Sequence, residues 1–456
     1  MRARSFQSRL PVMIILSGVL LKAACLQAEE TTPPRVVSVM EAVEQALKNN
    51  HEIRAQENAL LAQEADVGAA LSHLLPKVTL EERYSLTTNP GYAFFSKLNQ
   101  GRITMQDFNP EELNNPERIR DFQTALNVEQ PVFVKQAYLG LGLARREKRA
   151  RQEDLRRKRE EIAYRVLKAA CTVTSAREFV RASGQAVDEA REHERVARLR
   201  YANGLGQYAD TLRAATALSQ ALQRRNVAEK NLALARRYLG LLMAADGPVD
   251  IGEAELRLPE HEVSFYQESA RTRSDLNAAG LRSLNAKESI RLAEARYWPS
   301  VGVGGTYQFN DHDRVFGSEG TSWQVGAYLR WDLFDGAKRE YDRAKARHQS
   351  EQSREAVAAM QDGIGYRIAE AYADVQEARA NSALARQALE TAEEGARLVR
   401  LRYTNGLATL ADLLNTQTAL EEARVSAVER ENAVRTAQAT LSFESGAILP
   451  DLGIRD

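Results

Sequence analysis

Two aspartates in a repeated segment are the residues whose type and spacing point to chemistry in this chain. The sequence reads RLRYANGLGQYAD at 198–210 and RLRYTNGLATLAD at 400–412, so Asp210 and Asp412 occupy equivalent places. Each precedes an amphipathic run, where a carboxylate can accept backbone N–H groups as the N-cap of the next helix. Over 21 positions from the start of each segment, thirteen residues are identical. We therefore predict an internal twofold repeat.

No other pattern in the chain is typical of a catalytic or metal centre. The sequence has no glycine-rich phosphate loop, no GxSxG, no HExxH and no CxxC. His51 has no second His or Cys at metal-ligand spacing, which favours a helix-start residue over a ligand. We predict a protein that is not an enzyme and binds no metal or other cofactor.

The composition indicates long helices and gives no electrostatic case for nucleic acid. The formal net charge is 0, and 27% of the 456 residues are charged. Ala, Arg, Glu, Leu and Gln dominate long stretches, as they do in coiled coils. With Cys25 near the N-terminus and Cys171 as the second of two cysteines, no disulfide framework is expected.

The N-terminus has the pattern of an export signal. Three arginines precede the apolar core 10–21, which is too short to span a membrane as a helix, and cleavage after Ala28 is plausible. Acylation of Cys25 is an alternative, but Lys22 stands where a lipoprotein signal prefers an aliphatic residue. Since no later segment approaches 18 consecutive apolar residues, we expect a mature chain that is periplasmic, secreted or inserted as a β-barrel.

Each half of the chain then passes from helix to strand at a proline. Helical patterns at 39–71 and 265–295 end shortly before Pro76 and Pro299. Proline stops a helix and favours extended backbone in the residue before it. We expect Pro76 and Pro299 to mark the two helix-to-strand junctions.

The segments after these prolines alternate apolar and polar residues, as two-faced strands do. The return strands are expected to end at Phe133 and Phe334, and about ten residues of the second carry a tryptophan near each end. Such strands suit a barrel wall with aromatic girdles, although a surface hairpin of a soluble sandwich is an alternative. The expected girdle residues are Trp323, Trp331, Phe133 and Phe334.

Very long helices follow, and the repeated segments form their tips. Neither 135–201 nor 336–403 contains a proline, and both keep apolar or small residues at alternating spacings of three and four. Each run ends at Tyr-x-Asn-Gly-Leu, where Gly204 and Gly406 suit the left-handed residue after a helix. We predict two long helical hairpins, with returning helices at 211–243 and 413–443.

These features in this order resemble the TolC family of outer-membrane efflux proteins, over roughly 36–452. The resemblance implies a mainly α fold with a transmembrane β-barrel: three chains share a 12-stranded barrel and a long periplasmic helical tunnel. It also implies a signal peptide at 1–28 and two repeats, at 29–250 and 251–456. The resemblance rests on the twofold repeat, the junctions at Pro76 and Pro299, the strand-to-helix junctions at Phe133 and 333–336, and the paired tips.

The same resemblance implies a location and partners. The protein would be a homotrimer in the outer-membrane lipid of a Gram-negative bacterium. It would work with a periplasmic membrane-fusion adaptor and, through the adaptor, an inner-membrane pump of RND or ABC type. In the family the tips contact the adaptor, which here implicates Arg200, Gly204, Leu205, Arg402, Gly406 and Leu407.

The family also closes its tunnel with aspartates near the start of the second helix of a tip hairpin. Asp412 matches the first such position, whereas the second is Asn415, which halves the charge of the expected ring. Three copies of Asp412 around a threefold axis would repel one another or hold a cation. An ordinary helix cap also explains Asp412, and for Asp210 we expect a cap that hydrogen-bonds the other hairpin.

Three functions are compatible with these patterns. The first is a passive outer-membrane conduit for small molecules or ions, driven by a partner. The second is the channel of a type I protein secretion system. The third, from a different class, is a periplasmic coiled-coil scaffold without a pore. The sequence leaves open the substrate and the identity of the pump and adaptor.

Overall fold

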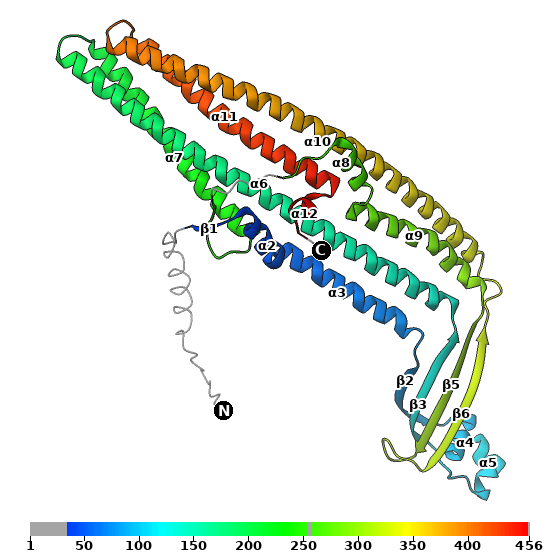
Figure 1. The fold of residues 1–456 in the computed structure, drawn as a ribbon. Helices are drawn as coiled ribbons and strands as arrows, with labels where there is room; N and C mark the ends of the chain where they lie inside the picture. The colour runs from blue at the N-terminus through cyan, green and yellow to red at the C-terminus, as the bar shows by residue number, and fades with distance from the viewer. Residues whose placement is uncertain (1–33, 253–257, 455–456) are drawn as a thin grey trace, which may run out of the picture. The chain divides into compact units, whose positions relative to one another are not determined.

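The computed structural model describes residues 34–252 and 258–454 (Figure 1). The expected signal peptide and Cys25 lie outside the described residues. The chain divides into two compact units. The hairpin unit contains the described residues of 1–50, 162–258 and 374–439, and the sheet unit those of 51–161, 259–373 and 440–456.

The helices and strands follow the predicted order in both halves of the chain. The first half contains β1 Arg35–Val37, α2 Val39–Asn49, α3 His51–Ser72, β2 Lys77–Thr87, α4 Pro90–Asn99, the 3-10 turn η1 Met105–Phe108, α5 Pro110–Asn114, β3 Ile119–Phe133, α6 Lys135–Ala202 and α7 Tyr208–Leu242. The second contains β4 Val249–Ile251, α8 Val263–Ala270, α9 Ser274–Glu294, η2 Ala295–Tyr297, β5 Ser300–Asp311, β6 Gly320–Arg330, α10 Lys338–Thr404, α11 Leu410–Ser445 and α12 Ile448–Asp451.

The sheet unit is built on one antiparallel sheet with the strand order β2-β3-β5-β6. Register rows such as Leu80–Leu126–Tyr307–Trp323 run across all four strands and place apolar side chains on one face. The neighbouring row, Glu81–Ala125–Gln308–Ser322, lies on the opposite and more polar face. The predicted two-faced alternation is therefore present along the whole sheet.

The two prolines lie where the sequence placed them. Pro76 directly precedes β2 and Pro299 directly precedes β5. The second return strand is shorter than expected, because β6 ends at Arg330 and not at Phe334. Beyond it, the carbonyls of Asp332 and Leu333 accept hydrogen bonds from the Arg339 guanidinium at 2.9 and 2.8 Å, so they do not extend the ladder.

The connection between β2 and β3 contains α4, η1 and α5, and α4 and α5 lie beside the end of the sheet at which β5 turns into β6 (Figure 1). Asn89 and Asn109 cap α4 and α5, each followed by proline at the first helical position. Next to α4, the buried Gln100 amide donates to Asp121 Oδ1 at 2.9 Å. Asn310 of β5 donates to the same carboxylate at 3.0 Å, so a buried polar cluster ties the insertion to the sheet.

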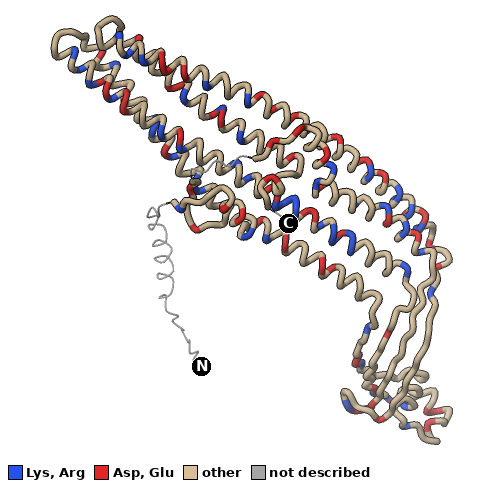
Figure 2. Tube along the Cα trace, in the orientation of Figure 1, with Lys and Arg blue, Asp and Glu red and all other residues tan. Residues whose placement is uncertain are grey.

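The long helices α6 and α10 bury the seams that their spacing predicted. In α6 the seam residues from Ile162 to Val173 are buried, and in α10 those from Ile364 to Val375 are buried. The later seam positions are partly buried and partly half-buried, as at Val180 and Leu389, and Tyr201 at the end of the first seam is 48% exposed. Charged residues are frequent along these helices and sparse along β5 and β6 (Figure 2).

The helical segment that precedes each strand pair is divided into two helices, α2 and α3 before β2, and α8 and α9 before β5. His51 is the first residue of α3, as expected for a helix-start residue, and Asn50 separates it from α2 with extended backbone. In the hairpin unit, the Asn50 amide donates to the Leu242 carbonyl at 2.8 Å, and β1 pairs in parallel with β4.

Among the described residues, no helix combines the length and apolar character needed to cross a membrane.

Candidate functional site: the two hairpin tips

The first tip, residues 198–213, ends α6 in a Schellman turn. Gly204 has a φ of 73°, and its N–H donates to the Tyr201 carbonyl at 3.0 Å. The next N–H, of Leu205, donates to the Arg200 carbonyl at 2.8 Å. These two bonds satisfy carbonyls that the helix end would otherwise leave unpaired, and they require a left-handed residue between them.

The second tip, residues 400–415, repeats this turn with the same distances. Gly406 has a φ of 76° and donates to the Tyr403 carbonyl at 3.0 Å. Leu407 donates to the Arg402 carbonyl at 2.8 Å. The expected left-handed conformation of both glycines is thus confirmed.

Asp412 was expected to be the N-cap of the returning helix, but the N-cap lies three residues before it. The helix α11 starts at Leu410, and the Asp412 carboxylate accepts from the Thr409 N–H at 2.9 Å and the Thr409 hydroxyl at 2.7 Å. In return the Asp412 N–H donates to Thr409 Oγ1 at 3.1 Å. Thr409 is therefore the cap, and Asp412 is the reciprocating third residue of a capping box.

Asp210 is not an N-cap either, and its surroundings differ from those of Asp412. The N-cap of α7 is Gln207, which makes no side-chain capping bond. Asp210 pairs instead with Arg213 along its own helix, at 3.5 Å. Among the described residues of this single chain it makes no hydrogen bond to the other hairpin, so the expected inter-hairpin role stays a prediction.

Arg200 joins the first tip to the second. The Arg200 guanidinium donates to the Tyr403 carbonyl at 2.7 Å and lies 5.0 Å from the centre of the Tyr403 ring. The equivalent Arg402 is exposed and makes no hydrogen bond through its side chain in the described part of the chain. Of the expected adaptor-contacting arginines, Arg200 is thus half-buried in a contact within this chain and Arg402 is available to solvent.

The apolar residues of the tips divide into an exposed and a buried set. Leu205 and Leu407, at the turns themselves, are both well exposed. Tyr403 is only 6% exposed and belongs to a core between the hairpins. The buried members of that core are Ala197, Ala214, Tyr403, Leu410 and Leu413.

Asp412 and Asn415 lie three residues apart at the start of α11, so they share one side of the helix. Both side chains are exposed. The N–H and hydroxyl of Thr409, together with the nearby charge of Arg402, hold the pKa of Asp412 below its usual range. The side of α11 that carries Asp412 and Asn415 therefore presents one ionised carboxylate and one neutral amide at neutral pH.

A charged cluster behind the tips was not foreseen from the sequence. Glu189 of α6 lies 3.5 Å from Arg400 and 3.4 Å from Arg424, and it also accepts a hydrogen bond from Gln417. His193, one turn along α6, is buried, and burial together with Arg400 lowers its pKa. The partners are more than 200 residues apart in the chain, so no local spacing could have revealed them.

The four expected girdle residues have different surroundings. Trp323 lies exposed on the apolar face of β6, whereas Trp331 and Phe334 lie beyond its end. The Trp331 indole donates to the Tyr297 carbonyl at 3.1 Å. A register shift after Pro131 pairs Phe133 with Val301, on the apolar face.

The chain can be compared with known proteins on this basis. A family model described as outer membrane efflux protein matches residues 42–245 and 265–447, well over half of the chain. The chain belongs to the outer membrane efflux protein family. Each of the two matched ranges contains one strand pair and one tip hairpin. The outer membrane efflux protein BepC of Brucella suis is 22% identical over 450 residues, covering 97% of this chain and 91% of that protein.

Solved structures of similar fold extend over nearly the whole chain. A membrane protein from Pseudomonas aeruginosa superposes with a TM-score of 0.78 at 18% identity, covering 90% of this chain and 91% of that one. The outer membrane protein VceC of Vibrio cholerae gives a TM-score of 0.74 at 17% identity, covering 90% and 96%. The fold of this family member is thus shared along its length, while the sequences have diverged widely.

Proposed function

We propose that the protein is the outer-membrane channel of a tripartite efflux system, a passive conduit for small molecules or ions. Three chains would each contribute the sheet β2-β3-β5-β6 to one 12-stranded barrel, and their long helices to a periplasmic tunnel. Family membership supports the efflux role. With no catalytic motif in the sequence, the energy would come from an inner-membrane pump reached through a periplasmic adaptor.

The observation that carries the proposal is the exposed apolar face of the sheet. Val78, Leu80, Trp323, Val325 and Leu329 all lie on this face and are all exposed in the single chain. Soluble proteins rarely leave such a patch open to water, whereas a strand in contact with lipid needs one.

The edges of the sheet explain why several copies are needed. Within the chain, β2 and β6 each pair on one side only. In lipid an unpaired strand edge leaves backbone N–H and C=O groups without partners, at a cost of several kcal/mol each. Pairing β6 of one copy with β2 of the next would close the sheet. A trimer would thereby remove both edges in every chain.

The tips are the proposed periplasmic end of the conduit. We assign adaptor contact to the exposed parts of both turns, Leu205, Leu407 and Arg402, which project from rigid Schellman turns. Asp412 would form a ring of three carboxylates that narrows the tunnel, weakened by the neutral Asn415. The matched order of elements in 29–250 and 251–456 favours an origin by duplication.

The test is a pair of neighbouring substitutions on opposite faces of β6. Trp323→Lys replaces an expected girdle residue with a charge on the proposed lipid face, at a cost that reaches about 2–4 kcal/mol at the centre of a bilayer and falls towards its surfaces. Gln324→Lys, on the polar face, serves as the matched control. We expect the wild type and Gln324→Lys to insert in outer membranes as trimers and to conduct in planar bilayers. Trp323→Lys should insert and conduct much less than either of them.

Two outcomes would overturn the proposal. If the purified wild type is a water-soluble monomer that does not conduct, the channel assignment fails and a periplasmic scaffold takes its place. If Trp323→Lys and Gln324→Lys insert and conduct equally well, the apolar face of the sheet does not contact lipid.

A further inference from the structure

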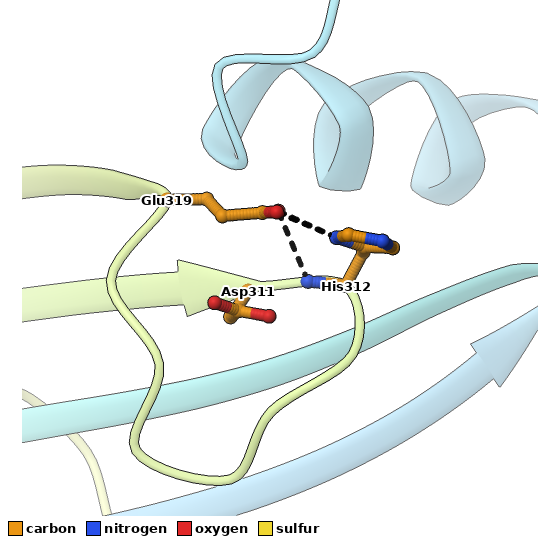
Figure 3. Close-up of side chains that lie close together, drawn as sticks. All are labelled: Asp311, His312 and Glu319. Carbon is orange, nitrogen blue, oxygen red and sulfur yellow. Dashed lines mark hydrogen bonds and ion pairs between the residues drawn. The ribbon is translucent and has the colours of Figure 1, made fainter.

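The β5–β6 hairpin brings together three side chains of the types that bind metal ions. Asp311 ends β5, His312 follows it, and Glu319 directly precedes β6. Each offers one ligand atom, and these atoms lie within 4.8 Å of one another (Figure 3). None of these residues takes part in the channel function proposed above.

The imidazole of His312 already faces the Glu319 carboxylate. Its Nδ1 lies 2.7 Å from Glu319 Oε1 and 2.8 Å from Oε2. The backbone N–H of His312 also donates to Oε2 at 3.3 Å. The hairpin therefore holds these two groups together across the loop, with the nitrogen of one directed at the oxygens of the other.

The Asp311 carboxylate completes the set and is oriented by the backbone of the loop. Its Oδ1 accepts from the N–H groups of Asp313 and Arg314 at 2.8 and 2.9 Å. Its Oδ2 accepts no hydrogen bond from any described residue, although Asp311 is only 5% exposed. This oxygen can therefore be reached by water or by a cation.

The loop is shaped around that oxygen. Gly317 lies so close that a Cβ at this position would overlap Asp311 Oδ2. Phe316, the residue before it, adopts a φ of 58°, which is uncommon for a non-glycine residue. The backbone thus turns tightly over Asp311, which keeps this carboxylate beside the His312–Glu319 pair.

We propose that Asp311, His312 and Glu319 bind a divalent transition-metal ion, with Zn²⁺ as the best-suited probe. Imidazole nitrogen and carboxylate oxygen are both ligands of Zn²⁺, and three protein ligands leave the fourth position of the ion to water. Ca²⁺ and Mg²⁺ prefer all-oxygen sites, so the imidazole disfavours them. Tetrahedral ligands at about 2.0–2.2 Å from Zn²⁺ lie roughly 3.4 Å apart, so the 2.7 Å His312–Glu319 contact would open by roughly 0.7 Å.

The bound ion would join the two ends of the hairpin. Asp311 and His312 belong to the β5 side and Glu319 to the β6 side, so an ion held by all three fixes the loop between the strands. Asp311 also follows Asn310, which hydrogen-bonds Asp121 in the cluster that supports α4. Metal binding is therefore expected to reduce hydrogen exchange in residues 312–319 and in the neighbouring end of α4.

The experiment measures Zn²⁺ binding to the full-length, detergent-solubilised protein without a polyhistidine tag, after treatment with a chelator. Titration calorimetry should show one ion per chain, retained in excess Mg²⁺. His312→Gln and Glu319→Gln should each weaken binding at least tenfold. His348→Gln is the matched control, because His348 is an exposed histidine on α10 outside the cluster. Circular dichroism melting checks that each variant is folded.

The alternative is a His312–Glu319 ion pair that needs no metal. If the wild type binds no Zn²⁺ at one per chain, or if His348→Gln weakens binding as much as His312→Gln, the proposed site does not exist. A non-conducting wild type that still binds one Zn²⁺ would reject the proposed channel and leave the metal site standing. A conducting wild type that binds no Zn²⁺ would leave the proposed channel standing and reject the metal site.

Discussion

The two tips have nearly the same sequence and the same turn, but they occupy different environments. Tyr201 and Tyr403 are equivalent residues, yet Tyr201 is 48% exposed and Tyr403 is 6% exposed. One helical turn beyond the glycines, Tyr208 is 58% exposed while its counterpart Leu410 is 2% exposed. The residues that the tips share therefore determine the turn, whereas the few positions at which the tips differ determine which tip packs inside the chain.

The comparison also separates the surfaces available to partners. The second tip contributes Tyr403, Leu410 and Leu413 to the core shared by the hairpins. The first tip leaves Tyr201 and Tyr208 on the surface, with their ring centres 5.4 Å apart. The first tip therefore leaves an aromatic surface uncovered in this chain, while the second supplies most of the core that packs the two hairpins together.

The largest expected effect comes from truncating a side chain that is buried in the second tip and exposed at the equivalent position of the first. Leu410→Ala deletes a fully packed side chain, and such changes typically cost about 2–5 kcal/mol. Tyr208→Ala, at the equivalent position, removes a mostly exposed ring and should cost much less. Hydrogen exchange measured by mass spectrometry should show faster exchange throughout both tips in Leu410→Ala only. Equal exchange in the two variants would remove the asymmetry between the tips.

The second prediction concerns the glycine turn that both tips share. Gly204→Val and Gly406→Val each force a β-branched residue into the left-handed region, at a cost of roughly 1–2 kcal/mol. We expect both to loosen their own turn and to reduce crosslinking to the adaptor. Gly395→Val is the control, because Gly395 lies within α10 and a Cβ there meets no neighbouring atom. Unchanged crosslinking and drug resistance in both tip variants would contradict the role of the turns.

The features predicted from the sequence are those encoded by neighbouring residues. Pro76, Pro299, Gly204 and Gly406 lie at the predicted junctions and turns, because each acts through its own backbone. The alternation of the strands and the long helices followed from periodicity. Family membership then confirmed the resemblance that these features had suggested.

The errors arose where two local signals compete or where distant residues meet. The aspartates were assigned as N-caps, but Thr409 takes that place and uses Asp412 as its partner. The pairs Asn89–Pro90 and Asn109–Pro110 are typical cap and first-turn residues, so the sequence did contain a signal for α4 and α5. The Asp311–His312–Glu319 cluster depends on hairpin register, which the short loop sequence does not specify.

A smaller effect is expected for the arginine that joins the tips. Arg200→Ala removes a hydrogen bond to the Tyr403 carbonyl and a contact with its ring, worth about 1–2 kcal/mol together. Arg402→Ala, the equivalent change, should leave the structure unaffected because Arg402 is exposed. Exchange of the amides between 403 and 410 should rise in Arg200→Ala alone. A similar rise in Arg402→Ala would show that the tips respond alike.

The smallest effect concerns the two aspartates at neutral pH. The folded pKa of Asp412 is depressed, so its bonds to Thr409 stabilise the start of α11 above the ordinary carboxylate range and are lost as the pH falls through that lower value. Between pH 6 and 8 no change is expected from this group. Asp412→Ala should therefore fray the first turn of α11 at pH 7 and, by removing the proposed ring of charge, raise the resting single-channel conductance.

Asp210→Ala is the control that makes this measurement informative. Among the described residues, Asp210 forms a 3.5 Å ion pair with Arg213 on its own helix and takes part in no capping box. Its removal should leave conductance close to that of the wild type. If Asp412→Ala frays the helix but leaves conductance unchanged, the carboxylate acts in the capping box alone and the narrowing of the tunnel must depend on other residues. If both variants raise conductance equally, the two tips contribute alike to the constriction despite their different packing.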